Sequence, residues 1–400
     1  MRRAEDSATA RCQSEMVKGP VEPSQFRGLA GRLGRPPFSL ALFAELPLII
    51  AGFYAWTIVV AHRWAMQDFE TVRRAGHDVI HGISPYPPPD PAVVAHATRL
   101  VYPPLIAYLF SPFAVLPYHV AAAIYLVLSV AAVPIALRVL GVRDWRCCGV
   151  AFLWYPAVAG LGVGAIGPIL ALLVALSWRY RDRAVVAALL VAVTITLKLF
   201  LWPLGVWMLA TRRWRAAVLT AALTAAALLV PFAPLGMHVL RTYPSVLRTL
   251  DHVFGPVSFS TIAFLQAAGL SSEVASGAVV VLGALLVAGI VLLARRPDGD
   301  RLALTAAVTA ALLLSPIVWI HYFVLLLVPV ALARPRLAGL WFLPIVFWST
   351  HALESDGELW RLSVALATVT AVTWLCMQGE QSRRALTSSQ EAGVRAVPAS

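Results

Sequence analysis

Asp68 is the acidic residue whose position best suits chemistry, because it stands near the start of the stretch from Gln67 to Pro89. Apolar residues recur in this segment at intervals of three and four, which predicts an amphipathic helix along a membrane face. The dipole of such a helix favours a charged carboxylate at its beginning. Asp68 could therefore accept a proton from a reacting hydroxyl group, although it could equally be an ordinary helix cap.

Lys198 and His321 are polar residues inside apolar stretches of the chain. Lys198 is one of two lysines among 32 basic residues. An ionisable group inside a membrane costs about 2.5 kcal/mol or more unless it has a partner. The alternatives are a lysine that extends to the lipid headgroups and a histidine that is hydrogen-bonded inside the core. Together with Asp68, these residues favour a shared cavity that could bind an anion and transfer a proton.

Two proline-rich groups follow the predicted helix, and each contains a tyrosine. Tyr86 lies in the first group, and Tyr102 begins the second. Proline fixes the backbone and removes a hydrogen-bond donor. Such segments suit the rigid wall of a site, or only a stiff loop.

The composition shows what must position these residues. Of the 400 residues, 60% are hydrophobic and 13% are charged, and the mean hydropathy of +0.77 excludes a water-soluble surface. We therefore expect an all-α polytopic membrane protein with one membrane domain. The net charge of +12 lies in arginine clusters between apolar runs, which is typical of topology signals and not of nucleic-acid binding. The four cysteines show no metal or disulfide spacing.

Twelve apolar runs are predicted to span the membrane, with both ends of the chain in the cytoplasm. This orientation places every arginine-rich connection inside. Several runs are shorter than the roughly 20 residues that a crossing needs, so some spans should be tilted or broken. The runs are Leu42 to Ala61, His119 to Leu137, Cys147 to Gly164, Gly167 to Trp178, Ala184 to Leu197, Leu199 to Ala210, Ala216 to Gly236, Val274 to Ala294, Leu302 to Pro316, Ile317 to Ala333, Ala338 to Thr350 and Trp360 to Met377.

The remaining segments are two tails and two long connections. Residues 1–41 and 378–400 are polar and predict disordered cytoplasmic tails around a transmembrane domain at residues 42–377. Two long connections then lie outside, from His62 to about Pro103 and from Met237 to Glu273. Long outer loops on short inner turns predict a site that faces outward.

Four groups of residues follow one another in a distinctive order. They are Asp68 with Ala75, Gly76, Gly82 and Pro85-Tyr86; Tyr102-Pro103-Pro104 with Ser111-Pro112; Lys198 with Trp202-Pro203 before Arg212-Arg213-Trp214; and Ser315-Pro316 with Trp319 and His321. In order and spacing, the chain from roughly Leu42 to Ala333 resembles glycosyltransferase family 87. The members of this family are integral-membrane mannosyltransferases of the GT-C superfamily that use polyprenyl-phosphate-mannose. The resemblance implies a GT-C-like transmembrane catalytic domain.

Three departures from the family pattern concern contacts to the acceptor or the sugar. The turn from Gly164 to Gly167 reads GAIG where such proteins often carry an amide residue. The stretch from Ser258 to Thr261 lacks an asparagine that is often found nearby, and Val72 stands where a tyrosine is usual. These departures leave the superfamily unchanged and leave the substrate open.

The resemblance implies an inverting, single-displacement transfer of a sugar, expected to be mannose, from a polyprenyl-phosphate donor. The acceptor would be the hydroxyl of an envelope glycolipid or polysaccharide outside the cytoplasm. A phosphate leaves without being protonated. The reaction therefore needs one base and cations, but no second carboxylic acid to protonate the leaving group. Asp68 would be the base, Lys198 would hold the donor phosphate, and His321 would orient either partner.

Further residues would complete this site. Arg73 and Arg74 follow Asp68 on the same helix and could help to hold the donor phosphate. Tyr86, Tyr102 and Trp319 would form the wall. The chain shows neither a nucleotide-sugar loop nor a metal-ligand spacing, so we expect no metal and no other cofactor.

Two other function classes remain open. A transporter or flippase of an anionic lipid-linked substrate would also use a multi-span bundle with a buried lysine. The lack of an internal inverted repeat and the long outer loop favour the enzyme. An inactive scaffold would keep the spans but would not need Asp68. The expected partners are the lipid donor, the acceptor and membrane lipids, with no nucleic acid.

Overall fold

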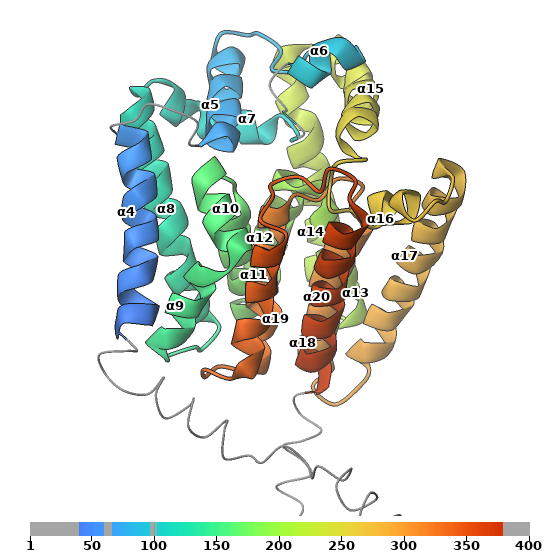
Figure 1. Ribbon diagram of the computed structural model, residues 1–400. Helices are drawn as coiled ribbons and strands as arrows, with labels where there is room; N and C mark the ends of the chain where they lie inside the picture. The colour runs from blue at the N-terminus through green and yellow to red at the C-terminus, as the bar shows by residue number, and fades with distance from the viewer. Residues whose placement is uncertain (1–39, 60–65, 97–99, 101, 379–400) are drawn as a thin grey trace, which may run out of the picture.

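The computed structural model describes residues 40–59, 66–96, 100 and 102–378, and all regular elements in these ranges are helices (Figure 1). This confirms the all-α prediction. The predicted tails fall almost entirely outside the described residues, as does part of the first outer loop.

Four helical segments are long and apolar enough to cross a membrane. They are α8 (Tyr118–Val139), α14 with its 3-10 extension (Trp214–Leu235), α17 (Ser272–Ala294) and α20 (Leu359–Gln378). A bent pair, α9 (Trp145–Leu153) and α10 (Tyr155–Val163), meets at 69° and could form a fifth, broken span. The chain is thus a multi-pass membrane protein, whereas the crossing of all twelve predicted segments stays a prediction.

Shorter helices fill the rest of the described chain, and each predicted apolar run is largely helical. The shorter helices are η1 (Ala41–Glu45), α4 (Leu46–Val59), α5 (Gln67–Ile80), α6 (Pro91–His96), α7 (Leu105–Ala114), α11 (Gly167–Arg179), α12 (Ala184–Leu197), η2 (Leu199–Leu201), α13 (Pro203–Ala210), η3 (Val230–Leu235) after α14 (Trp214–Leu229), α15 (Met237–Phe254), α16 (Thr261–Ala267), α18 (Gly299–Leu314), η4 (Ile320–Leu326), α19 (Leu327–Ala333) and η5 (Gly339–Ser349).

The two ends of the bundle differ in character. Helices α5, α6, α7 and α15 lie together at one end (Figure 1). At the other end, Asp300 at the start of α18 forms ion pairs with Arg181 and Arg213, which follow α11 and α13. Three arginine-rich connections therefore meet at one end of the bundle, away from α5 (Figure 1).

Helix α5 is held against α7 and α8 by its apolar side. It buries Phe69, Val72, Ala75, Gly76 and Val79. A Cβ atom on Gly76 would lie 3.0 Å from backbone atoms of α7, so a larger residue would push the two helices apart by a few tenths of an ångström. The apolar side of α5 thus faces the protein, and its contact with a membrane remains a proposal.

Candidate active site

Three polar residues from distant parts of the sequence meet near the start of α5. His321 Nε2 lies 3.5 Å from Asp68 Oδ2, which is ion-pair distance but longer than a hydrogen bond. The next residue, Tyr322, accepts a hydrogen bond at its hydroxyl from Lys198 Nζ. Because His321 and Tyr322 are adjacent, Asp68 and Lys198 are brought to the same region of the bundle.

Asp68 does not occupy the cap position of its helix. The N-cap residue is Met66, which has a left-handed backbone (φ 67°) and donates its N–H to Gly162 O at 2.8 Å. Asp68 is the second residue of α5, and its side chain is about one-third exposed, at 34%. An accessible carboxylate beside a buried histidine suits proton transfer better than it suits a helix cap.

Lys198 is buried among aromatic rings. Its residue exposure is 6%, and Nζ lies 3.9 Å from the ring centroid of Tyr102 and 4.5 Å from that of Tyr322. Ring faces attract a cation through their quadrupole but do not neutralise its charge. A phosphate that reached this ammonium would therefore meet a positive charge in a water-poor setting, where electrostatic attraction is strong.

The position of Lys198 follows from a break between two helices. Proline at position 203 lacks an N–H group, and its ring would collide with the carbonyl group four residues earlier. A proline therefore kinks or breaks a helix, and here the chain breaks. Helix α12 ends at Leu197, Lys198 is extended (φ −148°, ψ 103°), and α13 begins at Pro203.

A second proline breaks the chain before His321. The residue that precedes a proline avoids the helical conformation. Accordingly α18 ends at Leu314, and Ser315, which precedes Pro316, has φ −68° and ψ 132°. The chain becomes helical again in the 3-10 helix η4. Successive side chains of a 3-10 helix diverge by about 120°, so adjacent residues can serve different partners.

The stretch from Ser258 to Thr261 stabilises this second break. Backbone groups that leave a helix need new hydrogen-bond partners when they are buried. Phe259 N donates to Val318 O at 2.7 Å, and Thr261 Oγ1 donates to Leu313 O at 2.7 Å. This stretch, identified above as a departure from the family pattern, therefore supports the segment that carries His321.

The glycine-rich turn between α10 and α11 packs against both α5 and η4. Gly164 has φ +69°, and a Cβ atom there would lie 2.8 Å from Phe69 Cβ. A Cβ atom on Gly167 would lie 3.2 Å from His321 O. The GAIG turn thus allows α5 and η4 to pack closely here because Gly164 and Gly167 have no side chains.

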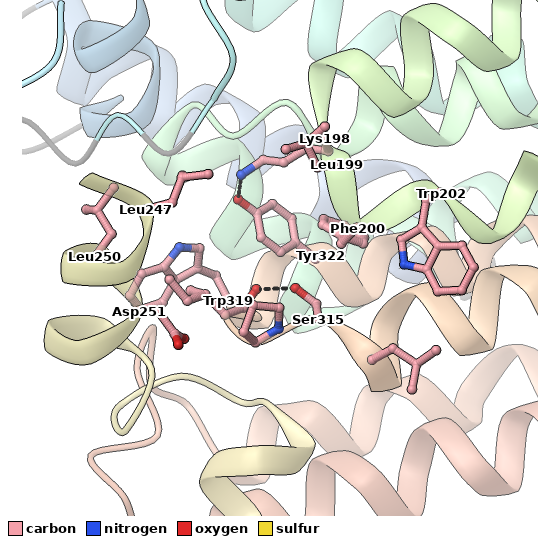
Figure 2. Close-up of a pocket in the computed structure, with 13 residues that line it drawn as sticks. Lys198, Leu199, Phe200, Trp202, Leu247, Leu250, Asp251, Ser315, Trp319 and Tyr322 are labelled. Carbon is pink, nitrogen blue, oxygen red and sulfur yellow. Dashed lines mark hydrogen bonds between the residues drawn. The ribbon is translucent and has the colours of Figure 1, made fainter. Parts of the chain in front are cut away.

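Lys198 and Tyr322 also line a cavity of about 290 Å³ (Figure 2). Its walls are mainly apolar and come from α15, from the break after α12 and from the break after α18. They comprise Leu199, Phe200, Trp202, Leu247, Leu250, Leu314, Pro316, Ile317 and Trp319, with Asp251 and Ser315 as further polar residues. Asp68 and His321 do not line this cavity, so Lys198 and Tyr322 form the boundary between it and the Asp68 side of the site.

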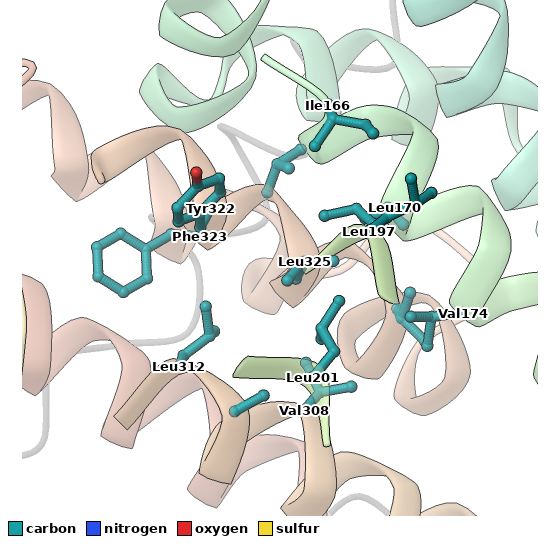
Figure 3. Packing of buried hydrophobic residues seen from close by; sticks show 14 of the residues in the cluster. Ile166, Leu170, Val174, Leu197, Leu201, Val308, Leu312, Tyr322, Phe323 and Leu325 are labelled. Carbon is teal, nitrogen blue, oxygen red and sulfur yellow. The ribbon is translucent and has the colours of Figure 1, made fainter. Parts of the chain in front are cut away.

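The segment that carries Tyr322 is fixed by a tightly packed core (Figure 3). Leu197 and Leu201 from the first break, Leu312 from α18 and Leu325 from η4 are all nearly inaccessible to solvent. The Tyr322 ring lies 5.2 Å from the ring of Phe200. Close packing on this scale leaves little freedom for the hydroxyl that binds Lys198.

The predicted wall residues have different roles in the structure. Trp319 lines the cavity, and the ring of Tyr102 contacts Lys198. Tyr86 supports Tyr102, because its hydroxyl donates to Tyr102 O at 2.8 Å, and its ring packs 5.0 Å from that of Tyr243. Burial and neighbouring phenols raise the pKa of Tyr86, so this group stays a neutral donor.

The structure does not bring Arg73 and Arg74 to Lys198. Both bind Glu70, at 2.7 and 2.6 Å, on a different side of α5 from Asp68. At ~100° per residue, they lie about 140° and 240° around the helix from Asp68. Burial raises the pKa of Glu70, but hydrogen bonds from the two arginines outweigh this effect and lower it below its usual value.

Two residues of the site were missed by sequence reasoning. Tyr322 directly follows His321, and the only signal was a second polar group in the same apolar run. Asp251 lies on α15 at the cavity, where partial burial raises the pKa of its carboxyl group. In the sequence, Asp251 could have been noticed as an acidic residue beside Leu247 and Leu250, which lie on the apolar side of α15.

Comparison with known proteins gives two matches. The model of glycosyltransferase family 87 matches residues 100–319, more than half of the chain. This range contains Lys198 and lies between Asp68 and His321. The polyprenol-phosphate-mannose-dependent alpha-(1-2)-phosphatidylinositol pentamannoside mannosyltransferase of Mycolicibacterium smegmatis is 31% identical over 290 residues, which cover 67% of this chain and 69% of that protein. No solved structure matches the chain.

Proposed function

Because the chain belongs to glycosyltransferase family 87 and is a glycosyltransferase, we propose that it transfers mannose from a polyprenyl-phosphate donor to the hydroxyl of an envelope glycolipid or polysaccharide. The donor is suggested by the name of the relative from Mycolicibacterium smegmatis. The observation that carries the proposal is the meeting of Asp68, His321 and Lys198, since these three groups suffice for the chemistry.

Asp68 acts as the general base in this proposal. The acceptor oxygen bonds to the anomeric carbon of the sugar while the bond from that carbon to the phosphate oxygen breaks. The acceptor proton passes to Asp68, and the bonding electron pair leaves with polyprenyl phosphate. Attack from the face opposite the phosphate inverts the configuration. The imidazole of His321, 3.5 Å away, orients the carboxylate.

Lys198 holds the donor phosphate. Negative charge on the phosphate grows as the glycosidic bond breaks, so a fixed ammonium stabilises the transition state more than the ground state. Tyr322 fixes the position of the ammonium through its hydroxyl. The apolar cavity behind Lys198 is suited to the first isoprene units of the donor lipid, because its walls are leucine, phenylalanine and tryptophan.

The orientation in the membrane is part of the proposal. We assign the arginine-rich end around Asp300 to the cytoplasm and the end with α5 and α15 to the outside, with twelve crossings and both tails inside. A chain without its four native cysteines, carrying a single cysteine at Ser84 or Asp298, tests this assignment. An impermeant thiol reagent on intact cells should label position 84 only. Labelling of position 298 alone would mean that the chain has the opposite orientation, and the assignment would be wrong.

The transfer itself is tested with purified protein. Labelled polyprenyl-phosphate-mannose is incubated with a panel of lipid acceptors, and label transfer is followed by mass spectrometry. Asp68→Asn serves as the matched inactive control. Transfer from the native protein but not from this variant supports the proposal. The proposal fails if the native protein, shown to bind polyprenyl phosphate, transfers a different sugar and no mannose.

A further inference from the structure

A second cavity lies at the arginine-rich end of the bundle, at the opposite end from α5. It has a volume of about 410 Å³ and lies between the turn from α13 to α14 and the turn from α17 to α18. Its charged lining residues are Arg212, Arg213, Arg295 and Asp300. Three arginines face one aspartate, so the lining carries an excess of positive charge.

The single aspartate is already saturated with donors. Asp300 accepts hydrogen bonds from Arg213 at 2.8 Å, from Arg181 at 2.6 Å and from the indole of Trp207 at 2.9 Å. These contacts join α11, α13 and α18 into a fixed floor for the cavity. Asp300 therefore has little capacity left to neutralise the remaining arginines.

Arg212 and Arg295 are the charges that remain. Both side chains are exposed, and within the described residues neither guanidinium has a hydrogen-bonded or ion-paired partner. Arg212 also has a left-handed backbone (φ 61°), which is uncommon for residues other than glycine. Two unpaired guanidinium groups at one cavity can bind a phosphate diester through several charge-assisted hydrogen bonds.

The surroundings of the cavity favour a lipid over a soluble anion. Helices α14 and α17 both pack on α13 and flank the cavity. Only 22% and 11% of their most apolar stretches are buried, so their free faces contact the hydrocarbon of the membrane. Trp214, at the start of α14, is 60% exposed, as is usual for tryptophan at headgroup level.

We propose that this cavity binds the headgroup phosphate of an anionic membrane phospholipid, whose acyl chains lie along α14 and α17. Topology-directing arginines need only to stay on one side of the membrane. Arg212 and Arg295 in addition line a shared hollow with a rigid floor, and basic pockets of this kind between membrane helices recognise lipid phosphates. The site is independent of sugar transfer.

The test uses the full chain in detergent and native mass spectrometry of bound lipid. Dioleoyl-phosphatidylglycerol is titrated, with dioleoyl-phosphatidylcholine as the neutral-headgroup comparison. The double variant Arg212→Gln/Arg295→Gln removes both free arginines. The matched control, Arg215→Gln/Arg296→Gln, removes two exposed arginines from the same two connections that do not line the cavity.

We expect the cavity variant to bind phosphatidylglycerol about 25-fold more weakly, or about fivefold for each arginine, and the control to change less than twofold. Phosphatidylcholine should bind weakly to all three proteins. An equal loss of affinity for phosphatidylglycerol in the control variant, or no loss of affinity in the cavity variant, would overturn the proposal. Competition by glycerol phosphate as strong as that by the intact lipid would also overturn it, in favour of a soluble anion. None of these readouts depends on mannose transfer.

Discussion

Replacing Lys198 by methionine should raise stability while it lowers activity. The lysine is 6% exposed, and an ammonium at such a position in a membrane costs about 2.5 kcal/mol or more. The hydrogen bond that it donates to Tyr322 returns about 1 kcal/mol. Methionine keeps the length of the side chain without the charge, so Lys198→Met should gain roughly 1 to 2 kcal/mol in free energy of unfolding.

The same substitution removes the cation that, in the proposed mechanism, faces the departing phosphate. Loss of one preorganised donor to a developing oxyanion costs about 3 to 4 kcal/mol, so the transfer rate should fall about 10²- to 10³-fold. Lys198→Arg should recover only part of this rate, because its planar guanidinium cannot take the position of the ammonium between Tyr102 and Tyr322.

The assay compares three quantities for each variant in lipid nanodiscs. These are the turnover of labelled donor, the affinity for polyprenyl phosphate without a sugar, and the temperature of thermal unfolding. Tyr322→Phe is the matched control, since it removes the hydrogen bond but keeps the charge and the ring. Its turnover should fall by about tenfold or less.

The reasoning would be refuted if Lys198→Met kept both native turnover and native affinity for polyprenyl phosphate. The lysine would then merely extend to the membrane interface. The donor phosphate would need another cation, and Arg73 or Arg74 would have to leave Glu70 to supply it. A large fall in unfolding temperature would separately refute the estimate of the burial cost.

Three further substitutions test the geometry. Asp68→Asn should fold normally and lose at least about a hundredfold in transfer rate, whereas Glu70→Gln should change the rate little. A near-normal rate for Asp68→Asn would rule out Asp68 as the base. His321→Ala should lower turnover more than affinity for polyprenyl phosphate, and the reverse pattern in a titration would place His321 on the donor. Gly164→Ala should reduce turnover, and stability in thermal unfolding, by more than Gly269→Ala does. Both glycines have positive φ, but only at Gly164 would a Cβ atom meet a neighbour, at 2.8 Å.

Local signals in the sequence predicted the helices and their breaks. Apolar runs predicted the helical segments, and the period of three and four from Phe69 to Ile80 predicted a helix where α5 lies. Pro203 begins α13 after the break that follows α12, and Pro316 follows the end of α18, as the steric limits of proline favour. The predicted segment from Cys147 to Gly164, by contrast, is bent by 69° between α9 and α10. Hydropathy shows that a segment is apolar but not whether its helix axis is straight or bent.

Contacts between distant segments could not be predicted in the same way. Nothing near His321 in the sequence indicates that Tyr322 would bind Lys198, because the pairing depends on where the break after α12 lies relative to η4. The ion pairs of Arg73 and Arg74 with Glu70 could have been predicted from the helical repeat. Glu70 lies three residues before Arg73 and four before Arg74, so the three side chains share one side of the helix. A role for Arg73 or Arg74 at the donor phosphate stays a prediction.

The polar residues of the site and the two helix breaks depend on one another. A membrane tolerates irregular backbone only where it is buried in protein or lines a cavity, and it tolerates a lysine only where a partner is at hand. Lys198 satisfies both conditions because Pro203 interrupts the helix there and the cavity adjoins it. A straightened helix, as in Pro203→Ala, would remove the break without removing the charge. The stretch from Ser315 to His321 shows the same combination of a proline break and a polar residue in an apolar run.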